Sequence, residues 1–196
     1  MSLSSQLASR SRNLRKVTTR VTSADGRVFH ETNGEVLSLG ETALGFVADL
    51  EPDLQVGRIS DRLFIGSQDV ASDVSLLTQY GITHILSVAP VDTLRCPSID
   101  YLVVPVVDLP EEQLSVHFPA CFGFIERGIR AGRVLVHCNA GVSRSTAVII
   151  AYLMYRHQRC LAEALRIVKI ARPCAKPNEG FLKQLQLYEQ HLHLNG

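Results

Sequence analysis

The sequence predicts an α/β fold in which a central, mostly parallel sheet is flanked by helices. From about Asp53 onward, short apolar stretches typical of strands alternate with longer stretches typical of helices. The stretch at residues 133–138 is apolar almost throughout, which indicates a strand buried on both faces of a sheet. Hydrophobic residues form 46% of the 196 residues, so the chain can bury a large core.

Residues 1–52 are expected to form a separate N-terminal extension. They are polar and contain glycine at positions 26, 34, 40 and 45. Two alternating runs around Asp25-Gly26 predict a short hairpin, because this dipeptide favours the tight turns that join antiparallel strands. The extension also carries a basic arm that precedes its first acid and contains Arg10, Arg12, Arg15, Lys16 and Arg20.

The basic arm has three interpretations. The simplest is a solvated segment without a specific role. The composition also suits a mitochondrial transit peptide, which is rich in arginine and serine and poor in acids. Basic residues before Val17 and Val21 would, alternatively, suit a segment that docks on a kinase.

The region after the extension begins with strands and one short helix. One or two short strands are predicted within residues 57–67. A short helix over residues 73–81 ends at Gly81, because glycine commonly ends helices. The apolar runs at residues 82–89 and 101–107 are the next two predicted strands.

The second half of this region is mainly helical. Residues 116–132 are amphipathic and end in glycine, and the buried strand at 133–138 follows. Residues 145–157 are apolar nearly all round, as is typical of a helix at the centre of a domain. Two further helices are predicted over residues 161–172 and 178–193.

Charge and hydropathy exclude several classes of function. The formal net charge of +1 disfavours a general binder of nucleic acid or of membrane surfaces. The longest apolar run, Thr146–Tyr155, is too short to span a bilayer, and Ser2 removes the signal for N-myristoylation. We therefore expect no nucleic-acid partner and no membrane partner.

The cysteines indicate a reducing compartment. There are five, an odd number with irregular spacing and without a C-x-x-C pair, whereas disulfide frameworks and zinc sites show regular pairs. We expect free thiols, no metal, and a cytoplasmic protein that also enters the nucleus; mitochondrial import is the alternative. The four cysteines outside the candidate site are expected to be structural, with Cys121 in the core, and Cys174 is a candidate disulfide partner on oxidation. The five are Cys96, Cys121, Cys138, Cys160 and Cys174.

The stretch VLVHCNAGVSRSTAV, residues 134–148, carries the strongest functional signal. A strand, a tight loop and a helix follow one another, so backbone N–H groups gather at a helix N-terminus, where phosphate and other anions bind. Cys138 stands at the carboxyl end of the strand, where ligands of α/β sheets bind. The residues that follow are small enough to wrap closely around an oxyanion: Asn139, Ala140, Gly141, Val142 and Ser143.

Arg144 completes this arrangement. Its planar guanidinium can hold two phosphate oxygens at once. Gly141 permits a backbone conformation that other residues avoid. The N–H groups and the helix dipole favour the thiolate form of Cys138. The sequence therefore predicts a cysteine nucleophile inside an anion site.

A thiolate in an anion site suggests attack on phosphorus and a covalent thiophosphate intermediate. The leaving group then needs a proton, and Asp108 is the best candidate, because it follows an apolar strand and precedes Pro110 on an expected loop. Glu111 and Glu112 are alternative acids, although they look like acids of a first helical turn. Ser145 is placed to hydrogen-bond the departing sulfur.

The residues His137-Cys138-x-x-Gly141-x-x-Arg144 match the signature of cysteine-dependent protein tyrosine phosphatases. The stretches HCNAGVSRS, AYLM and RPCAKPNEGF resemble the dual-specificity phosphatases, in their atypical subgroup. This resemblance implies a protein-tyrosine-phosphatase-like fold and a catalytic domain over residues 53–193. It also implies hydrolysis of phosphotyrosine, phosphoserine and phosphothreonine in proteins through a cysteinyl-phosphate, without cofactor or metal.

The same resemblance implies a role for each candidate residue. Cys138 is the nucleophile, Arg144 and the loop residues before it bind the phosphate, Asp108 is the general acid, and Ser145 stabilises the thiolate. His137 and Asn178 are expected to support the site. Plainer alternatives stay open: Asp108 as a loop or capping acid, and Asn178 as the cap of the last helix. His137 is expected to be a structural hydrogen-bonding group rather than a proton shuttle.

The expected partner is a phosphorylated protein, such as a MAP kinase or an upstream kinase in stress-activated signalling, and a monomer is expected. The uncharged residues at positions 139, 140, 142 and 143 disfavour inositol lipids and RNA, since a multiply charged substrate needs more than one cation. Two other classes of function stay open. One is a catalytically silent phospho-binding module, which would need Cys138, Arg144 or Asp108 to be missing, although all three are present. The other is a kinase scaffold that acts through the extension.

Overall fold

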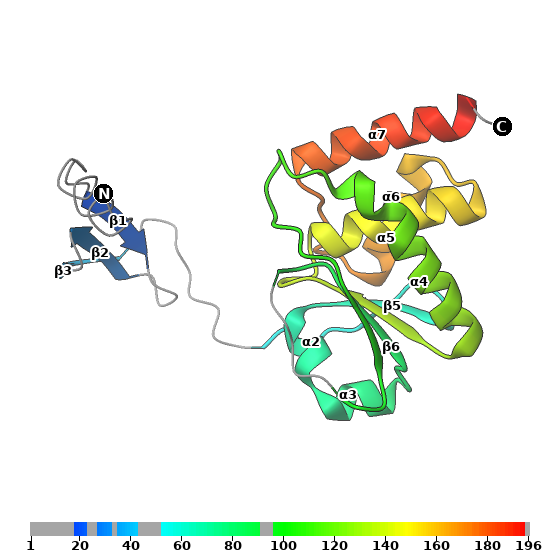
Figure 1. Ribbon diagram of the computed structural model, residues 1–196, viewed down its shortest axis with the longest axis horizontal. Coiled ribbons are helices and arrows are strands. Elements are labelled where there is room, and N and C mark those ends of the chain that lie inside the picture. Colours follow the sequence, from blue (N-terminus) through cyan, green and yellow to red (C-terminus); the bar gives the residue numbers. More distant parts are fainter. Residues whose placement is uncertain (1–17, 23–26, 33–34, 43–51, 91–95, 195–196) are drawn as a thin grey trace, which may run out of the picture. The chain divides into compact units, whose positions relative to one another are not determined.

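The computed structural model divides the chain into two compact units, Met1–Glu51 and Pro52–Gly196, which are described separately. The ribbon in Figure 1 follows the colours of the sequence. The residues that the structure describes are 18–22, 27–32, 35–42, 52–90 and 96–194.

The first unit contains a three-stranded antiparallel sheet in the order β1-β2-β3. β1 and β2 lie in the segment for which the sequence predicts a hairpin, and β3 is a strand that the sequence analysis does not predict. The Asp25-Gly26 turn and the arm residues before Val17 lie outside the described residues, so the docking and import interpretations stay predictions. The strands are β1 (Thr18–Thr22), β2 (Arg27–Thr32) and β3 (Glu35–Thr42).

The second unit is built around a five-stranded sheet in the order β4-β5-β8-β6-β7. Strands β5, β8, β6 and β7 are parallel, and the edge strand β4 is antiparallel to β5. The predicted fold class, a mostly parallel central sheet, is confirmed. The strands are β4 (Gly57–Arg58), β5 (Leu63–Gly66), β6 (His84–Ser87), β7 (Asp100–Val103) and β8 (Val134–His137).

Helices cover both faces of this sheet, as predicted (Figure 1). Along β8, Val134 and Val136 belong to the larger core and Leu135 to the smaller one, because successive strand residues point to opposite faces. Residues of α4, α5, α6 and α7 complete the larger core, and residues of α2 and α3 complete the smaller. The central strand β8 is thus buried on both faces, and Cys138 follows it at the carboxyl edge of the sheet.

The helix α5 lies at the centre of the larger core. Every residue from Arg144 to Met154 is buried, which explains why this segment is apolar nearly all round. No helix of the described residues is both long and apolar enough to cross a membrane. The helices are α2 (Gln68–Ser72), α3 (Val74–Gln79), the 3-10 helix η1 (Leu114–His117), α4 (Phe118–Ala131), α5 (Arg144–His157), α6 (Leu161–Ala171) and α7 (Glu179–Leu194).

Two local features differ from the expectation. Strand β7 ends at Val103, before the predicted end at residue 107, and Pro105 has no N–H group with which to continue the ladder. Glu111 and Glu112 lie in a turn before η1, whose first turn contains no acid. The expectation that they are first-turn helix acids is therefore wrong.

Candidate active site

The loop that carries Cys138 joins the central strand β8 to the buried helix α5. We call residues 138–144 the cysteine loop. Cys138 directly follows β8, and Arg144 begins α5, so elements of the core fix both ends of the loop. Cys138 is buried at 1% exposure, whereas Asn139 and Ala140 are exposed. The thiol therefore lies at the base of the loop.

The carbonyl groups of the cysteine loop are held from behind. In a planar trans peptide the N–H group points opposite to the C=O group, so the N–H groups of residues 140–143 point toward the other side of the loop. These four N–H groups lie opposite the bound carbonyls, where they can serve as the donors that an oxyanion site requires. The four bonds run to Asn139 O from Gln68 N (2.8 Å), to Ala140 O from Arg172 Nη2 (2.7 Å), to Gly141 O from Arg172 Nε (2.7 Å) and to Val142 O from Lys176 N (2.8 Å).

Gly141 is required for this conformation. Its φ angle is +63°, in the left-handed region that side chains disfavour. A Cβ atom there would clash with the backbone oxygen of Gly66 and would lie 2.8 Å from the Nε atom of Arg172. The unusual backbone conformation is expected from the sequence, whereas the close approach of Arg172 is seen only in the structure.

Ser145 lies beside the candidate nucleophile. The Cys138 Sγ and Ser145 Oγ atoms are 3.3 Å apart, and both residues are buried. A hydroxyl at this distance can donate a hydrogen bond to a thiolate or to a departing sulfur. The geometry is compatible with the role that the resemblance implies for Ser145.

Arg144 has a buried donor for which the described part of the chain offers no acceptor. Its side chain is 8% exposed, and its Nη1 atom donates to the Val106 carbonyl oxygen at 3.1 Å. Its Nε atom is buried without a hydrogen-bond partner, and the Asp108 Oδ2 atom lies 3.7 Å away, close enough for an ion pair but not for a hydrogen bond. A buried, unpaired guanidinium N–H at the start of α5 suits a bound anion.

Asp108 is hydrogen-bonded to the cysteine loop. Its Oδ1 atom accepts hydrogen bonds from Ser143 Oγ (2.7 Å) and Asn178 Nδ2 (2.8 Å). Its side chain is 35% exposed, so it is open to substrate and water. Two donors on Oδ1 orient the carboxyl group, and Oδ2, whose charged neighbour is Arg144 Nε at 3.7 Å, is left for proton transfer. Among the described residues, neither Glu111 nor Glu112 has a comparable hydrogen bond to the loop.

Asn178 combines the two roles that the sequence analysis leaves open. Its Nδ2 atom donates to Asp108, and its backbone N–H donates to Ser143 Oγ at 3.0 Å. Its Oδ1 atom accepts from the N–H of Phe181 at 2.9 Å, which is the bond of a helix N-cap. One residue thus begins α7 and links the candidate acid to the loop.

His137 is buried behind the site. Burial lowers the pKa of its imidazole to about 4. The hydrogen bond to Cys138 O opposes this shift, and the positive charge of Arg144 adds to it. The ring is therefore neutral near pH 7, and its Nδ1 atom lies 3.4 Å from Cys138 O. This setting favours the structural role over a proton shuttle.

The other cysteines differ in exposure. Cys121 is buried in the larger core, and burial raises the pKa of its thiol to about 12, so it is an inert core thiol. Cys96 and Cys160 are half-buried, and Cys174 is exposed. Among the described residues, no cluster of three or more His, Cys, Asp or Glu could hold a metal ion.

Sequence reasoning missed Arg172. This residue directly follows α6 and is completely buried, and it donates hydrogen bonds to two carbonyl groups of the cysteine loop. The stretch RPCAKPNEGF contains Arg172, but the sequence alone does not distinguish a buried arginine from a solvated one at the end of a helix. The one available signal is Pro173, which prevents the helix from continuing.

Replacing Asn178 with serine is expected to separate its two roles. Serine can still cap α7, but it lacks the amide that donates to Asp108, so kcat should fall roughly 10-fold through misplacement of the acid. Asn178→Ala removes the cap as well and should cost about 1 kcal/mol of stability in addition. Thermal melting and steady-state kinetics of both variants check this. Equal kcat for Asn178→Ser and the unaltered protein would show that the amide does not orient Asp108.

Comparisons with known proteins agree with this geometry. The sequence profile of the dual specificity phosphatase catalytic domain matches residues 63–191. Mouse dual specificity protein phosphatase 19 is 42% identical over 193 residues, covering 94% of this chain and 88% of that protein. A MAP kinase phosphatase with leucine-rich repeats from Dictyostelium discoideum is 35% identical over 158 residues, covering 81% of this chain and 22% of that protein.

A solved structure shares the fold. The crystal structure of a mouse protein assigned to the dual specificity phosphatases, complexed with zinc tungstate, superposes with a TM-score of 0.68 at 40% identity. The match covers 78% of this chain and 96% of that one. The fold, the profile and the relatives thus agree on one family.

Proposed function

The chain belongs to the dual-specificity phosphatase family, and from this premise we propose that it hydrolyses phosphotyrosine, phosphoserine and phosphothreonine in proteins through a cysteinyl-phosphate intermediate. Protein phosphatase activity is the property of the family. The observation that carries the intermediate is the position of the buried Cys138 thiol at the base of a loop in which the four carbonyls of residues 139–142 are bound by other parts of the protein. The loop N–H groups and Arg144 then face the phosphate.

In the first step, the thiolate of Cys138 attacks phosphorus. An S–P bond forms while the bond from phosphorus to the leaving oxygen breaks, and Asp108 donates a proton to that oxygen. The loop N–H groups and the Arg144 guanidinium stabilise the charge on the three remaining phosphate oxygens. These donors are in place before the reaction, so they need no reorganisation.

In the second step, water replaces the sulfur. Asp108, now a carboxylate, accepts a proton from the water as its oxygen attacks phosphorus. The S–P bond breaks, inorganic phosphate leaves, and the sulfur departs as a thiolate. Ser145 Oγ, 3.3 Å from the sulfur, donates a hydrogen bond that stabilises this leaving group.

The substrate is a phosphate monoester on a protein. Asn139, Ala140, Val142 and Ser143 carry no charge, so the loop offers a single guanidinium, which suits one phosphate group rather than a multiply phosphorylated lipid. We propose a MAP kinase or one of its upstream kinases as the partner; the printed name of the Dictyostelium relative, a MAP kinase phosphatase, supports this. A cytoplasmic and nuclear location fits such a partner.

Trapping the intermediate tests the mechanism. Rapid denaturation at neutral to alkaline pH during turnover of a phosphotyrosine or phosphothreonine peptide should leave the mass of one phosphoryl group on the peptide that contains Cys138, because unfolding stops the second step before the S–P bond is hydrolysed. Liquid chromatography with mass spectrometry of the digest locates the group. The same label on another residue, or release of phosphate without any label, would contradict the cysteinyl-phosphate route.

A further inference from the structure

Arg172 is an unusual residue for the interior of a protein. It follows the last residue of α6 and is 0% exposed. A buried guanidinium is costly unless its N–H groups find acceptors and its charge finds a partner. The partners of Arg172 therefore indicate what this side chain does.

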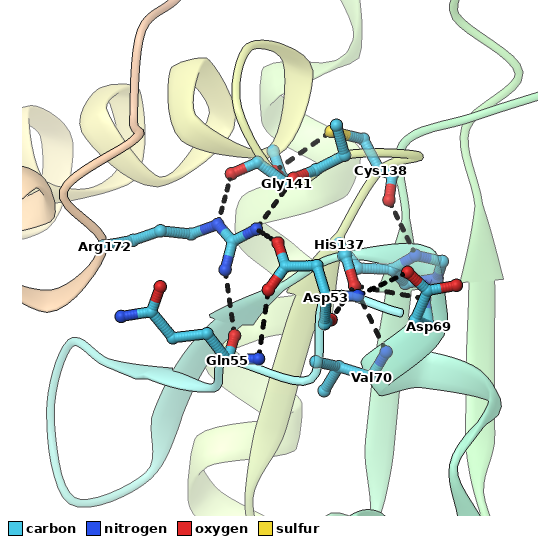
Figure 2. Close-up of polar contacts among 11 residues, drawn as sticks. Asp53, Gln55, Asp69, Val70, His137, Cys138, Gly141 and Arg172 are labelled. Atoms are coloured by element: carbon cyan, nitrogen blue, oxygen red, sulfur yellow. Dashed lines mark hydrogen bonds and ion pairs between the residues drawn. The ribbon is translucent and has the colours of Figure 1, made fainter. Parts of the chain in front are cut away.

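Two partners of Arg172 belong to the cysteine loop. Its Nε atom donates to Gly141 O at 2.7 Å, and its Nη2 atom donates to Ala140 O at 2.7 Å (Figure 2). The planar guanidinium thus donates to two consecutive carbonyl groups of the loop. Because C=O and N–H are opposed in a trans peptide, these two bonds aim the N–H groups of Gly141 and Val142 toward the anion site.

The other partners belong to the segment that begins the second unit. Arg172 Nη2 is paired with the Asp53 carboxylate, and Nη1 donates to Gln55 O at 2.9 Å (Figure 2). The carboxylate neutralises the buried charge and fixes the rotation of the guanidinium. Without the carboxylate, the guanidinium could rotate and lose its hydrogen bond to one of the two loop carbonyls.

Asp53 is itself held in place. Its backbone N–H donates to Asp69 Oδ2 at 3.0 Å, and its carbonyl accepts from Ser67 Oγ at 2.6 Å. Its Oδ1 atom accepts from the N–H of Gln55 at 3.1 Å. Ser67 also caps α2, whose first residue, Gln68, donates to the carbonyl of Asn139 in the cysteine loop. Segment 53–55 and the start of α2 thus support the loop together.

We infer that Arg172 is a positioning residue of the anion site and that Asp53 fixes the orientation of its guanidinium. Arg172 acts through the backbone of the loop: it turns two carbonyl groups away from the phosphate and two N–H groups toward it. The inference rests on the proposed function of the same loop. Arg172 is thus a second arginine of the site. It lies behind the loop, does not touch substrate, and sets the affinity of the site for an oxyanion.

Two substitutions test the inference against a matched control. Arg172→Lys keeps the charge but loses the planar fork, and Asp53→Asn keeps the size but loses the charge that orients the fork. The control is Asp61→Asn, which removes a carboxylate from the exposed Arg58–Asp61 pair. Asp53 is 42% exposed, so its variant is expected to fold even if a substitution of Arg172 does not.

The readouts are kcat and KM for an aryl phosphate, competitive inhibition by vanadate and inorganic phosphate, and thermal melting. Arg172→Lys should weaken inhibition and lower kcat/KM roughly 10–100-fold, because small displacements of catalytic groups cost this much. Asp53→Asn should produce the same pattern at roughly 3–10-fold, with Asp53→Glu restoring part of the loss. Asp61→Asn should leave all of these values unchanged. Assays run well below each melting temperature.

A lower melting temperature with unchanged kcat/KM and unchanged inhibition would overturn the inference, because Arg172 would then be a stability residue alone. An inactive unaltered protein would instead refute the proposed function. In that case, protection of Cys138 from iodoacetamide by phosphate still reports on the anion site. Weaker protection in Asp53→Asn than in Asp61→Asn supports the positioning role, and equal protection overturns it.

Discussion

Replacing Cys138 with serine is expected to abolish turnover while the protein stays folded. The loss should be on the order of 10³-fold or more, as for other essential nucleophiles. A serine hydroxyl needs a base to remove its proton, and burial makes His137 a weak base, because it lowers the pKa of the imidazole to about 4. The hydroxyl is also smaller than the thiol, so the buried position beside Ser145 accommodates it. Turnover of an aryl phosphate and a melting curve measure the two effects.

Cys174→Ser is the matched control for this substitution. Cys174 is exposed and lies outside the cysteine loop, so the same chemical change there should leave turnover intact. The Cys138→Ser protein should still bind vanadate or phosphate weakly, because the loop N–H groups and Arg144 remain. Turnover above about one per cent of the unaltered protein in a clean preparation would refute a cysteine nucleophile, given the loss that removal of such groups causes.

The parts of the fold that follow from local pattern could be predicted from the sequence. A buried strand is predicted at β8 because Val134, Leu135 and Val136 are all apolar. In the structure these residues are buried in two different cores. α5 reads as a central helix because both its faces are apolar. Short elements escaped prediction: α2 has only five residues, too few for a helical period to show, and its one local signal is the cap at Ser67.

The residues of the candidate site also fall into those that local sequence identifies and those that only tertiary structure identifies. Cys138, Gly141 and Arg144 lie in one stretch, so spacing alone brings them together. Asp108 lies 35 residues from Ser143. The sequence could only place Asp108 after a strand, so Glu111 and Glu112 remained alternative acids. Hydrogen bonds to Ser143 and Asn178 distinguish Asp108 from them, and such bonds depend on tertiary structure.

Arg172 shows why the remainder could not be predicted. Its partner Asp53 is 119 residues away, and its loop partners are about 30 residues away. A sequence offers no periodicity or spacing that connects such positions. The usual expectation for an arginine near the end of a helix is solvent exposure and a favourable interaction with the helix dipole. The structure instead buries its charge and uses it to hold backbone carbonyl groups.

Asp108→Ala is expected to lower kcat by about 10²–10⁴-fold, the usual contribution of a general acid. The loss should depend on the leaving group, because nitrophenolate departs without a proton whereas the alkoxide of serine does not. Phosphoserine and phosphothreonine peptides should therefore lose far more activity than nitrophenyl phosphate, and a plot of log kcat against leaving-group basicity should become steeper. Asp108 hydrogen-bonds the loop through Ser143, so melting curves are needed to show that the loss is not one of folding.

Glu112→Ala is the control for the choice of acid. Glu112 lies in the turn before η1, four residues from Asp108, and has the same carboxyl chemistry without the hydrogen bonds to Ser143 and Asn178. Its removal should leave both kcat and the leaving-group dependence unchanged. If Glu112→Ala or Glu111→Ala steepens the dependence while Asp108→Ala does not, the proton comes from the turn. The pairing of Asp108 with Ser143 and Asn178 would then serve only to join the loop to α7.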